Sequence, residues 1–416
     1  MAIDSRGKFS FVLWLALFLL AAGVGPALAA RRPHGARHAA TAAGEPGVAL
    51  EQVHVFGDRP APFVLDATAA CLVDARSGTQ LYAYNEHEKI EPASLAKIMT
   101  FYLVLQALRD RRLTVDTEVP VSEAAWRLSM DQSVSRMFLG VGQKVAVHDL
   151  LDGLMVSSGN DAAVTLAEYL AGSTDAFTKD MNDQAAKLGL NETHFDNPDG
   201  LPVPGEYTTA SDMVKLARAL TTRFPEAFTY TSTKEFTFDN IRQRNFNTLL
   251  FYDSRVNGLK TGHVQEAGFH LVATSNSNGL ELISAVMGTP SMEKRRTETE
   301  KLIDWAFHTF ASVSPDWRRA VSDSLPVYEG TADSVAVAPD RVPYATVFQG
   351  DEGKVVLTGG FDSRYLVAPV AAGTQVGEMT LSVNGTAQSA IPIRTQAPVP
   401  EAGIWKRFKD SIRMRF

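Results

Sequence analysis

Residues 92–108 restrict how this 416-residue chain can fold more than any other segment does. Pro92 favours a helix start, and the apolar side chains that follow are spread round all sides of a helical cylinder: Leu95, Ile98, Met99, Phe101, Leu103, Val104, Leu105 and Leu108. A helix that is apolar all round is buried on every side. We therefore expect other elements to wrap around it, and the chain is long enough for such a core and for two domains.

Ser94 and Lys97 interrupt the first turn of this apolar helix. They are three positions apart, so both side chains face the same side of the helix. A serine hydroxyl is a weak nucleophile until a base takes its proton. A lysine buried near other cations can be neutral at physiological pH, because desolvation disfavours the charged amine. The pair predicts a nucleophilic serine with a lysine base; the alternative, a helix-start serine and a surface lysine, fits an all-round apolar helix poorly.

Two further polar strings follow in the chain. Ser158-Gly159-Asn160 lies between two predicted helices, where a hydroxyl and an amide can relay a proton and hold a substrate amide, or simply cap a helix. Lys260-Thr261-Gly262 precedes a predicted strand, where an ammonium and a hydroxyl can bind a carboxylate and glycine permits close backbone approach. S-x-x-K and S-x-N each occur a second time, so the prediction depends on the order and the spacings of 64 and 102 residues.

The rest of the chain divides into segments of different character. The predicted elements are a β-hairpin over 69–84, a mainly helical region over 121–225, strands over 255–290, a helix over 298–310, and short strands after 321 that include 345–348. Strands on both sides of a helical middle predict an α+β domain with a sheet backed by helices. The later runs predict a small all-β domain. We place the two domains at 53–320 and 321–397.

The N-terminal residues predict an export signal over 1–29. Arg6 and Lys8 precede an apolar run, and Ala27 and Ala29 have the spacing of a cleavage site. An uncleaved membrane anchor is the alternative, although the run is marginal for a bilayer core of about 30 Å. Residues 30–52 lack periodicity and predict a flexible linker.

Residues 398–416 predict a basic amphipathic helix. The segment 401–416 has a net charge of +3, and aromatic or aliphatic residues recur in it at helical spacing: Trp405, Phe408, Ile412 and Phe416. Such a helix suits the outer face of the inner membrane and is too short to span it. The alternative is a tail that is solvated or packed on a domain.

Composition excludes some classes of function. The net charge of −7 gives no basic surface for nucleic acid. The single cysteine, Cys71, cannot form an internal disulfide, and we expect it to be buried in a strand rather than reactive. Export together with a lone cysteine fits a bacterial periplasm or cell surface.

The residues around the three strings resemble the low-molecular-mass penicillin-binding proteins, which are D-alanyl-D-alanine carboxypeptidases of serine peptidase family S11. The likeness lies in Pro92–Thr100, Ser158–Ala162, Gly258–His263, Asn197–Leu201 and Thr208–Met213. It implies a β-lactamase/transpeptidase-like catalytic domain of α+β class, with an antiparallel sheet, helices on both sides and a helical lobe. A small all-β domain and a C-terminal amphipathic helix would follow.

The resemblance further implies an enzyme that removes the terminal D-alanine from peptidoglycan stem pentapeptides. Ser94 would be the nucleophile and Lys97 its base, while Ser158 and Lys260 would carry a proton to the leaving D-alanine. The implied substrate-binding residues are Asn160 for the acyl side chain, Thr261 and Arg295 for the carboxylate, Gly262 for close approach, and the backbone N–H groups of Ser94 and His263 as oxyanion hole. Penicillins would acylate Ser94, and no metal or cofactor is needed.

Arg296 is the alternative to Arg295 as the arginine that binds the substrate carboxylate. Phe246 stands where some members of the resembled family carry a basic residue.

Three other functions remain open from the sequence. A β-lactamase of class A needs a deacylating glutamate between the second and third strings; Glu168, Glu192 and Glu206 lie there, but none has an E-x-x-N context. A DD-endopeptidase would cut cross-links with the same residues. A non-catalytic wall-binding protein would have no use for intact Ser94 and Lys97.

Overall fold

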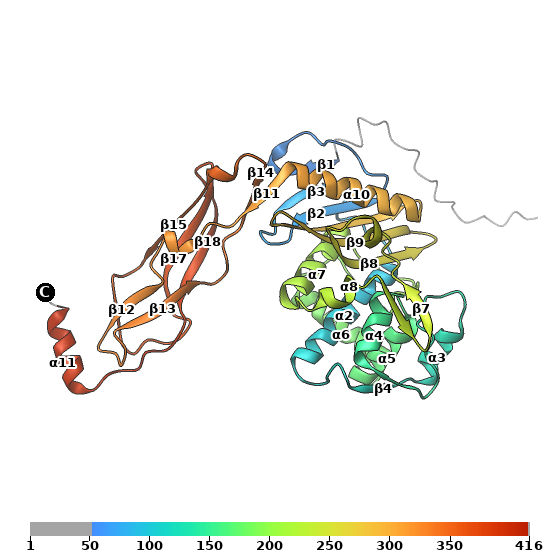
Figure 1. Ribbon diagram of the computed structural model, residues 1–416, viewed down its shortest axis with the longest axis horizontal. Coiled ribbons are helices and arrows are strands. Elements are labelled where there is room, and N and C mark those ends of the chain that lie inside the picture. Colours follow the sequence, from blue (N-terminus) through green and yellow to red (C-terminus); the bar gives the residue numbers. More distant parts are fainter. Residues whose placement is uncertain (1–51, 415–416) are drawn as a thin grey trace, which may run out of the picture. The chain divides into compact units, whose positions relative to one another are not determined.

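A computed structural model describes residues 52–414, so the predicted signal peptide (1–29) and all of the predicted linker except Gln52 lie outside the described residues. Six antiparallel strands form the central sheet in the order β1-β3-β2-β10-β9-β8 (Figure 1). Their bounds are β1 Val53–Val55, β2 Ala69–Asp74, β3 Gln80–Tyr84, β8 Val256–Val264, β9 Gly268–Ser277 and β10 Leu280–Thr289. The β2–β10 pair joins strands from before and after the helical region, as the predicted α+β fold requires.

Most helices lie in the chain between strands β3 and β8. They are α2 Lys97–Arg109, α3 Glu123–Met130, α4 Val147–Met155, α5 Asn160–Ala171, α6 Thr174–Lys187, α7 Ala210–Arg223, α8 Ala227–Thr231 and α9 Leu249–Tyr252, with α10 Met292–Thr309 after the last sheet strand. Every residue of α2 from Lys97 to Leu105 is buried. The predicted central helix is therefore confirmed.

The sheet carries helices on both faces because side chains alternate along each strand. Helix α10 lies on one face of the sheet, and α2, α4, α5 and α7 lie on the other (Figure 1). On β2, Cys71 belongs to the core formed with α2, α4, α5 and α7, while Leu72 belongs to the core formed with α10. Burial raises the pKa of the Cys71 thiol to about 12. The expected burial of this cysteine in a strand is confirmed.

Three local details differ from the predicted elements. Ser94 lies in a 3-10 turn, η2 Ala93–Ala96, that leads into α2 rather than in the α-helix itself. Helix α10 begins at Met292 instead of residue 298, because the Ser291 hydroxyl accepts a hydrogen bond from the Lys294 N–H at 3.1 Å and caps it. Two short two-stranded sheets were not predicted: β4 Glu118–Pro120 with β5 Lys144–Ala146, and β6 Glu235–Phe238 with β7 Ile241–Arg244.

The segment after residue 321 forms a second six-stranded sheet in the order β15-β17-β18-β13-β12-β16. Its strands are β12 Ser324–Tyr328, β13 Ser334–Pro339, β15 Val355–Phe361, β16 Leu366–Val367, β17 Gln375–Val383 and β18 Thr386–Thr395. It has its own apolar core around Val337, Met379 and Ile393. The strand at 345–348 (β14) forms but does not join this sheet. It pairs with β11 Phe310–Val313, and Phe348 packs against Phe310 with ring centroids 5.3 Å apart.

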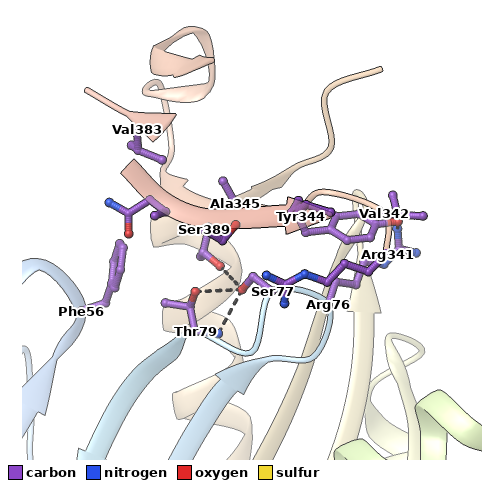
Figure 2. Close-up of a pocket in the computed structure, with 13 residues that line it drawn as sticks. Phe56, Arg76, Ser77, Thr79, Arg341, Val342, Tyr344, Ala345, Val383 and Ser389 are labelled. Carbon is purple, nitrogen blue, oxygen red and sulfur yellow. Dashed lines mark hydrogen bonds between the residues drawn. The ribbon is translucent and has the colours of Figure 1, made fainter. Parts of the chain in front are cut away.

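Polar contacts fix the segment around β14 to the β2–β3 turn (Figure 2). The hydroxyls of Ser77 and Thr346 are 2.6 Å apart, Thr346 Oγ1 donates to Asp74 Oδ2 at 2.8 Å, and Arg76 donates to the Tyr344 hydroxyl at 2.9 Å. The cavity at this junction measures about 130 Å³. Ligand pockets usually hold roughly 300 Å³ or more, so this cavity is smaller than a typical ligand site.

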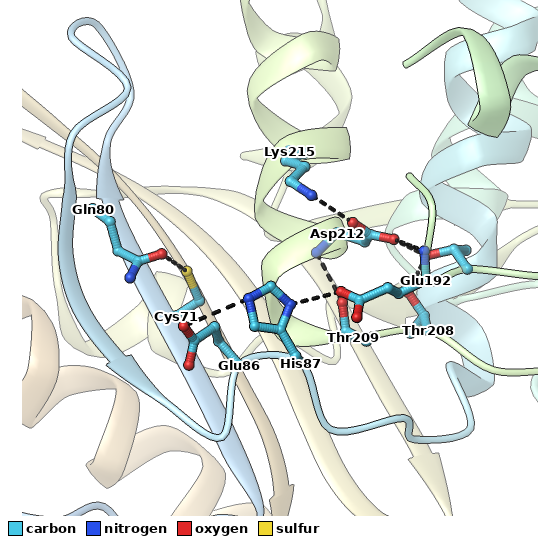
Figure 3. A network of polar contacts seen from close by, with 10 residues as sticks. Cys71, Gln80, Glu86, His87, Glu192, Thr208, Thr209, Asp212 and Lys215 are labelled. Atoms are coloured by element: carbon cyan, nitrogen blue, oxygen red, sulfur yellow. Dashed lines mark hydrogen bonds and ion pairs between the residues drawn. The ribbon is translucent and has the colours of Figure 1, made fainter. Parts of the chain in front are cut away.

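A second polar network holds the segment before Pro92 against α7 and the chain around Glu192 (Figure 3). His87 Nδ1 lies 2.6 Å from Glu192 Oε2. The buried Asp212 accepts hydrogen bonds from the Glu192 N–H at 2.8 Å and from Lys215 Nζ at 2.9 Å. The network therefore links the segment that precedes the Ser94 turn, through Glu192, to helix α7.

The C-terminal amphipathic helix is observed as α11, Ile404–Arg413; Phe416 lies outside the described residues. Its polar side contacts the all-β part, since the Asp410 carboxylate accepts the Glu329 N–H at 2.9 Å and Lys406 pairs with Asp333 at 2.6 Å. Its apolar side is open to solvent, with Trp405 87% exposed. Between residues 52 and 414, none of the helices has the length and hydropathy needed to cross a membrane.

Candidate active site

Two glycines allow neighbouring segments to pack closely against the turn that carries Ser94. Ala93 has a left-handed φ of 50°, and a Cβ on Gly200 would lie 1.9 Å from the Ala93 carbonyl oxygen. On the other side, a Cβ on Gly262 of β8 would lie 3.0 Å from the Pro92 oxygen. Strained, tightly enclosed backbone of this kind is typical of functional sites. It holds the Ser94 hydroxyl at a fixed place between β8 and the segment 197–201.

Lys97 is completely buried beneath Ser94. Its Nζ donates to Ser94 Oγ at 3.1 Å, to Asn160 Oδ1 at 2.5 Å, and to the Asp199 carbonyl oxygen. Burial lowers the pKa of the Lys97 amine from 10.5 to about 8, although the carboxylate of Asp199 opposes this change. An amine with such a pKa has a neutral fraction near physiological pH and can accept a proton from the serine.

Lys260 occupies the other side of the same site. It is buried, and its Nζ donates to Ser158 Oγ and to the Thr261 carbonyl oxygen, both at 2.9 Å. Burial lowers the pKa of Lys260 well below its usual value, and the positive charges of Lys97 and Arg295 lower it further. Each buried amine is therefore hydrogen-bonded to one serine hydroxyl.

Both serines open into one cleft of about 710 Å³. The predicted site residues that line it are Ser94, Ser158, Asn160, Thr261, Gly262, His263 and Arg295. Strand β8 is the edge of its sheet, so one side of its backbone is free to pair with an extended peptide. The structure thus brings together all nine predicted residues, seven on the cleft wall and the two lysines below it.

Arg295 and Arg296 point in different directions. Arg295 lines the cleft and donates to the Phe246 carbonyl oxygen at 3.1 Å. Arg296 pairs with Glu300 at 2.6 Å and does not line the cleft. Of the two arginines that the sequence left open, Arg295 is therefore the one in position to meet a substrate.

The sequence did not predict residues 131–139, called here the cleft loop, as part of the site. Ser135 lines the cleft, and its carbonyl oxygen accepts the Asn160 N–H at 2.9 Å. The buried Asp161 carboxylate accepts the backbone N–H groups of residues 137, 138 and 139 at 3.0 to 3.3 Å, and the Ser129 hydroxyl at 2.7 Å. An aspartate next to Ser158-Gly159-Asn160 resembles an ordinary helix cap, so only the fold shows that it holds this loop.

A serine hydrogen-bonded to a buried lysine, with a second serine–lysine pair across a cleft beside an edge strand, is the arrangement of a serine hydrolase that works through an acyl-enzyme. The comparisons agree with this class. Residues 57–291 match the family model described as D-alanyl-D-alanine carboxypeptidase, and residues 320–401 match the model described as penicillin-binding protein 5, C-terminal domain.

The chain is similar to several characterised proteins over most of its length. It is 37% identical to D-alanyl-D-alanine carboxypeptidase DacC of Escherichia coli, over 85% of this chain and 89% of that protein. The crystal structure of penicillin-binding protein 5 from Haemophilus influenzae aligns with a TM-score of 0.71 at 34% identity, over 82% of this chain and 100% of that one. Penicillin-binding protein D2 from Listeria monocytogenes, solved in a cefotaxime-bound form, aligns with a TM-score of 0.55 at 33% identity, over 60% and 100%.

The chain belongs to the D-alanyl-D-alanine carboxypeptidase family of serine peptidases. The resemblance drawn from the sequence, the predicted fold class and the predicted enzyme class are confirmed.

Proposed function

We propose that Ser94 attacks the carbonyl carbon between the two terminal D-alanines of a peptidoglycan stem pentapeptide, with Lys97 as its base. The 3.1 Å hydrogen bond between Lys97 Nζ and Ser94 Oγ carries this proposal. The lowered pKa of Lys97 supplies the neutral amine that takes the serine proton. The backbone N–H groups of Ser94 and His263 stabilise the oxyanion, which is usually the largest catalytic contribution.

The remaining residues bind the two ends of the substrate and deliver a proton to the leaving group. Because Asn160 Oδ1 accepts from Lys97, its NH₂ group is left to donate to the acyl part. Thr261 and Arg295 bind the terminal carboxylate. The Arg295 guanidinium is buried in the cleft wall, where it can form charge-assisted hydrogen bonds with a carboxylate. Ser158, hydrogen-bonded to Lys260, delivers a proton to the amine of the departing D-alanine. Water then hydrolyses the acyl-enzyme.

D-Alanine release from a pentapeptide muropeptide tests the catalytic roles. We expect Ser94→Ala and Lys97→Met to abolish release, while both variants remain folded because methionine suits the apolar surroundings of Lys97. The matched control is Lys294→Met, in the second S-x-x-K string, since this lysine is partly exposed and pairs with Asp66 at 3.1 Å, outside the cleft. Activity that survives in Lys97→Met would refute the lysine-base mechanism.

We also propose that penicillins acylate Ser94 and that the adduct is long-lived, which distinguishes the protein from a β-lactamase. None of Glu168, Glu192 and Glu206 lines the cleft, and burial raises the pKa of Glu206 to about 8, so it is mostly protonated at pH 7. Glu266 does line the cleft, but it is exposed on the β8–β9 turn. Mass spectrometry of the intact protein should show a persistent penicillin adduct; turnover within seconds would contradict the proposal.

We propose that the protein is exported and attached to the outer face of the inner membrane through α11. Ile404, Trp405 and Phe408 are 83%, 87% and 61% exposed on one side of this helix, where they would insert into the lipid interface. The helix has 10 residues, about 15 Å of length, so it lies along the surface.

Vesicle sedimentation tests the attachment without removing the helix. The double variant Trp405→Glu/Phe408→Glu should stay in the supernatant with unchanged D-alanine release. Val356→Glu, at another exposed apolar position of the all-β part, should still sediment. If the double variant sediments as well, α11 is not the attachment site. Cleavage after Ala29 is checked by N-terminal sequencing of the exported protein.

A further inference from the structure

Two hollows away from the active site meet at Arg223, the last residue of helix α7. One measures about 520 Å³ and lies between the C-terminal half of α2 and helix α8, with Arg109 and Glu226 on its wall. The other measures about 550 Å³ and lies between α7 and the β2–β3 turn, with Lys215 and Arg218 on its wall. We call the two hollows together the basic groove. The basic groove and the active-site cleft have no lining residue in common.

Neutral oxygens hold the three arginines of the basic groove in place. Arg218 donates to two backbone carbonyl oxygens of the β2–β3 turn, at 2.7 and 3.2 Å. Arg223 donates to the Tyr102 hydroxyl at 3.2 Å, and Arg109 donates to the Arg223 carbonyl oxygen at 3.0 Å. Only the fourth cation, Lys215, pairs with a carboxylate, that of a buried aspartate at 2.9 Å (Figure 3). Among the side chains that the structure describes, the three arginines form no ion pair.

The positive charge of these arginines is therefore largely uncompensated. Arginines on other helices are paired differently: Arg127 and Arg296 each contact a glutamate one turn away, at 2.8 and 2.6 Å. Arg109 and Arg223 lie in the last turns of their helices, but each helix end supplies only about half a negative charge. Of the described residues that line the basic groove, Glu226 alone is acidic. The net charge of −7 for the whole chain hides this local excess of positive charge.

The basic groove suits a ligand that carries carboxylates on a partly aliphatic chain. A guanidinium has five N–H donors. Arg218 uses two of them, and Arg109 and Arg223 use one each, so all three retain donors for an anion. A polyphosphate would leave the apolar lining uncovered, whereas an acidic peptide with small aliphatic side chains can cover it. This apolar lining includes Val73, Leu105, Leu108, Leu188 and Val214.

We propose that the basic groove is a second, non-catalytic site that binds the stem peptides of peptidoglycan through their free carboxylates. The choice of ligand rests on the proposed function, because an enzyme that acts on stem peptides works among many of them. Stem peptides combine free carboxylates with the methyl groups of alanine, which matches both the arginines and the apolar lining of the groove.

The groove and the cleft bind different stems. Helix α2 runs from Lys97, below the cleft, to Arg109 in the groove over 13 residues, so these two residues lie about 18 Å apart along the helix axis. Because α2 is buried and the two sites share no wall, one stem does not run directly from one site into the other. The groove thus holds the enzyme on the polymer while Ser94 acts on another stem.

Cosedimentation of the full chain with purified, lipid-free peptidoglycan tests the proposal, with Ser94→Ala present to prevent turnover. Binding should weaken several-fold between about 0.02 M and about 0.5 M salt, because exposed charges are screened. Arg218→Gln/Arg223→Gln should weaken binding at low salt by about tenfold. The matched control is Arg318→Gln/Arg364→Gln, which removes the same charge at two exposed arginines outside the groove. It should bind as its parent does.

A second variant leaves all the arginine contacts in place. Thr222→Glu/Thr229→Glu adds two carboxylates to the lining of the groove at exposed positions, and repulsion should again weaken binding by about tenfold. With Ser94 intact, both groove variants should release D-alanine from a soluble monomeric pentapeptide within twofold of wild type. Their release from peptidoglycan at subsaturating concentration should fall by about tenfold. A misfolded protein would not separate the two substrates in this way.

Three results would overturn the proposal. Unchanged binding to peptidoglycan in both groove variants would refute it and leave the carboxypeptidase function intact. Equal losses on the soluble pentapeptide and on the polymer would show that the variants damage the active site instead. Loss of self-association or of binding to anionic lipid vesicles, with peptidoglycan binding retained, would assign the groove to a second copy of the chain or to a lipid headgroup. If wild type releases no D-alanine from the pentapeptide, the proposed function fails, and sedimentation still decides whether the groove binds peptidoglycan.

Discussion

Replacing Asn160 with aspartate changes the electrostatics at the base with almost no change in shape. Asn160 Oδ1 lies 2.5 Å from Lys97 Nζ, so the variant puts a carboxylate in direct contact with the amine. An opposite charge at such a distance raises an amine pKa by about one to three units. The pKa of Lys97 is about 8 in the native protein, and should therefore rise to about 9 or higher in Asn160→Asp.

The consequence for the rate follows from the neutral fraction of Lys97. With a pKa of about 8, about one tenth of the amine is neutral at pH 7, and at a pKa of about 9 this falls to about one hundredth. Acylation of Ser94 by a penicillin needs the neutral amine, so the second-order rate constant should rise between pH 7 and pH 9 in wild type. In Asn160→Asp the same rise should occur at least one pH unit higher.

Stopped-flow acylation by a chromogenic β-lactam, measured from pH 6 to pH 11, gives both midpoints. The midpoint is the informative quantity, because the lost amide donor of Asn160 also lowers the amplitude. Asn191→Asp adds the same charge at an exposed position outside the cleft and should leave the midpoint unchanged. A midpoint that stays or moves down in Asn160→Asp would show that Lys97 is not the base.

Three further substitutions test the geometry around the site. Gly200→Ala should slow penicillin acylation more than about a hundredfold. The added Cβ would lie 1.9 Å from the Ala93 carbonyl oxygen, so the turn beside Ser94 would have to shift. Near-normal acylation would contradict this. Asp161→Ala leaves the buried donors of the cleft loop without an acceptor and should lower the free energy of unfolding by about 3 to 5 kcal/mol in urea denaturation; a loss under 1 kcal/mol would refute the anchoring role. His263→Ala should retain D-alanine release within about threefold, because the proposed mechanism uses only its backbone N–H and its ring stacks on Phe269 with ring centroids 3.9 Å apart. A hundredfold loss would assign the imidazole a catalytic role.

Much of the fold could be predicted because it follows from local patterns. The all-round apolar helix had to be buried, the alternation over 69–84 and 268–289 had to form strands, and Asn278-Gly279, with φ values of 50° and 82°, suits a tight hairpin turn. The segment 345–348 shows the limit of such patterns. The sequence predicted a strand here but not its partner, β11. The pairing depends on the contact between Phe348 and Phe310, which are far apart in the sequence.

By itself, the sequence determined which chemistry this protein carries: a serine with a lysine one turn away on a helix that cannot avoid burial, and two further polar strings in a fixed order. Only the tertiary structure decided how these groups act on one another. The lowered pKa of Lys97, the contact between Lys260 and Ser158, and the choice of Arg295 over Arg296 arise between residues far apart in the chain. Such effects depend on distance and burial in space, and linear spacing does not contain either quantity.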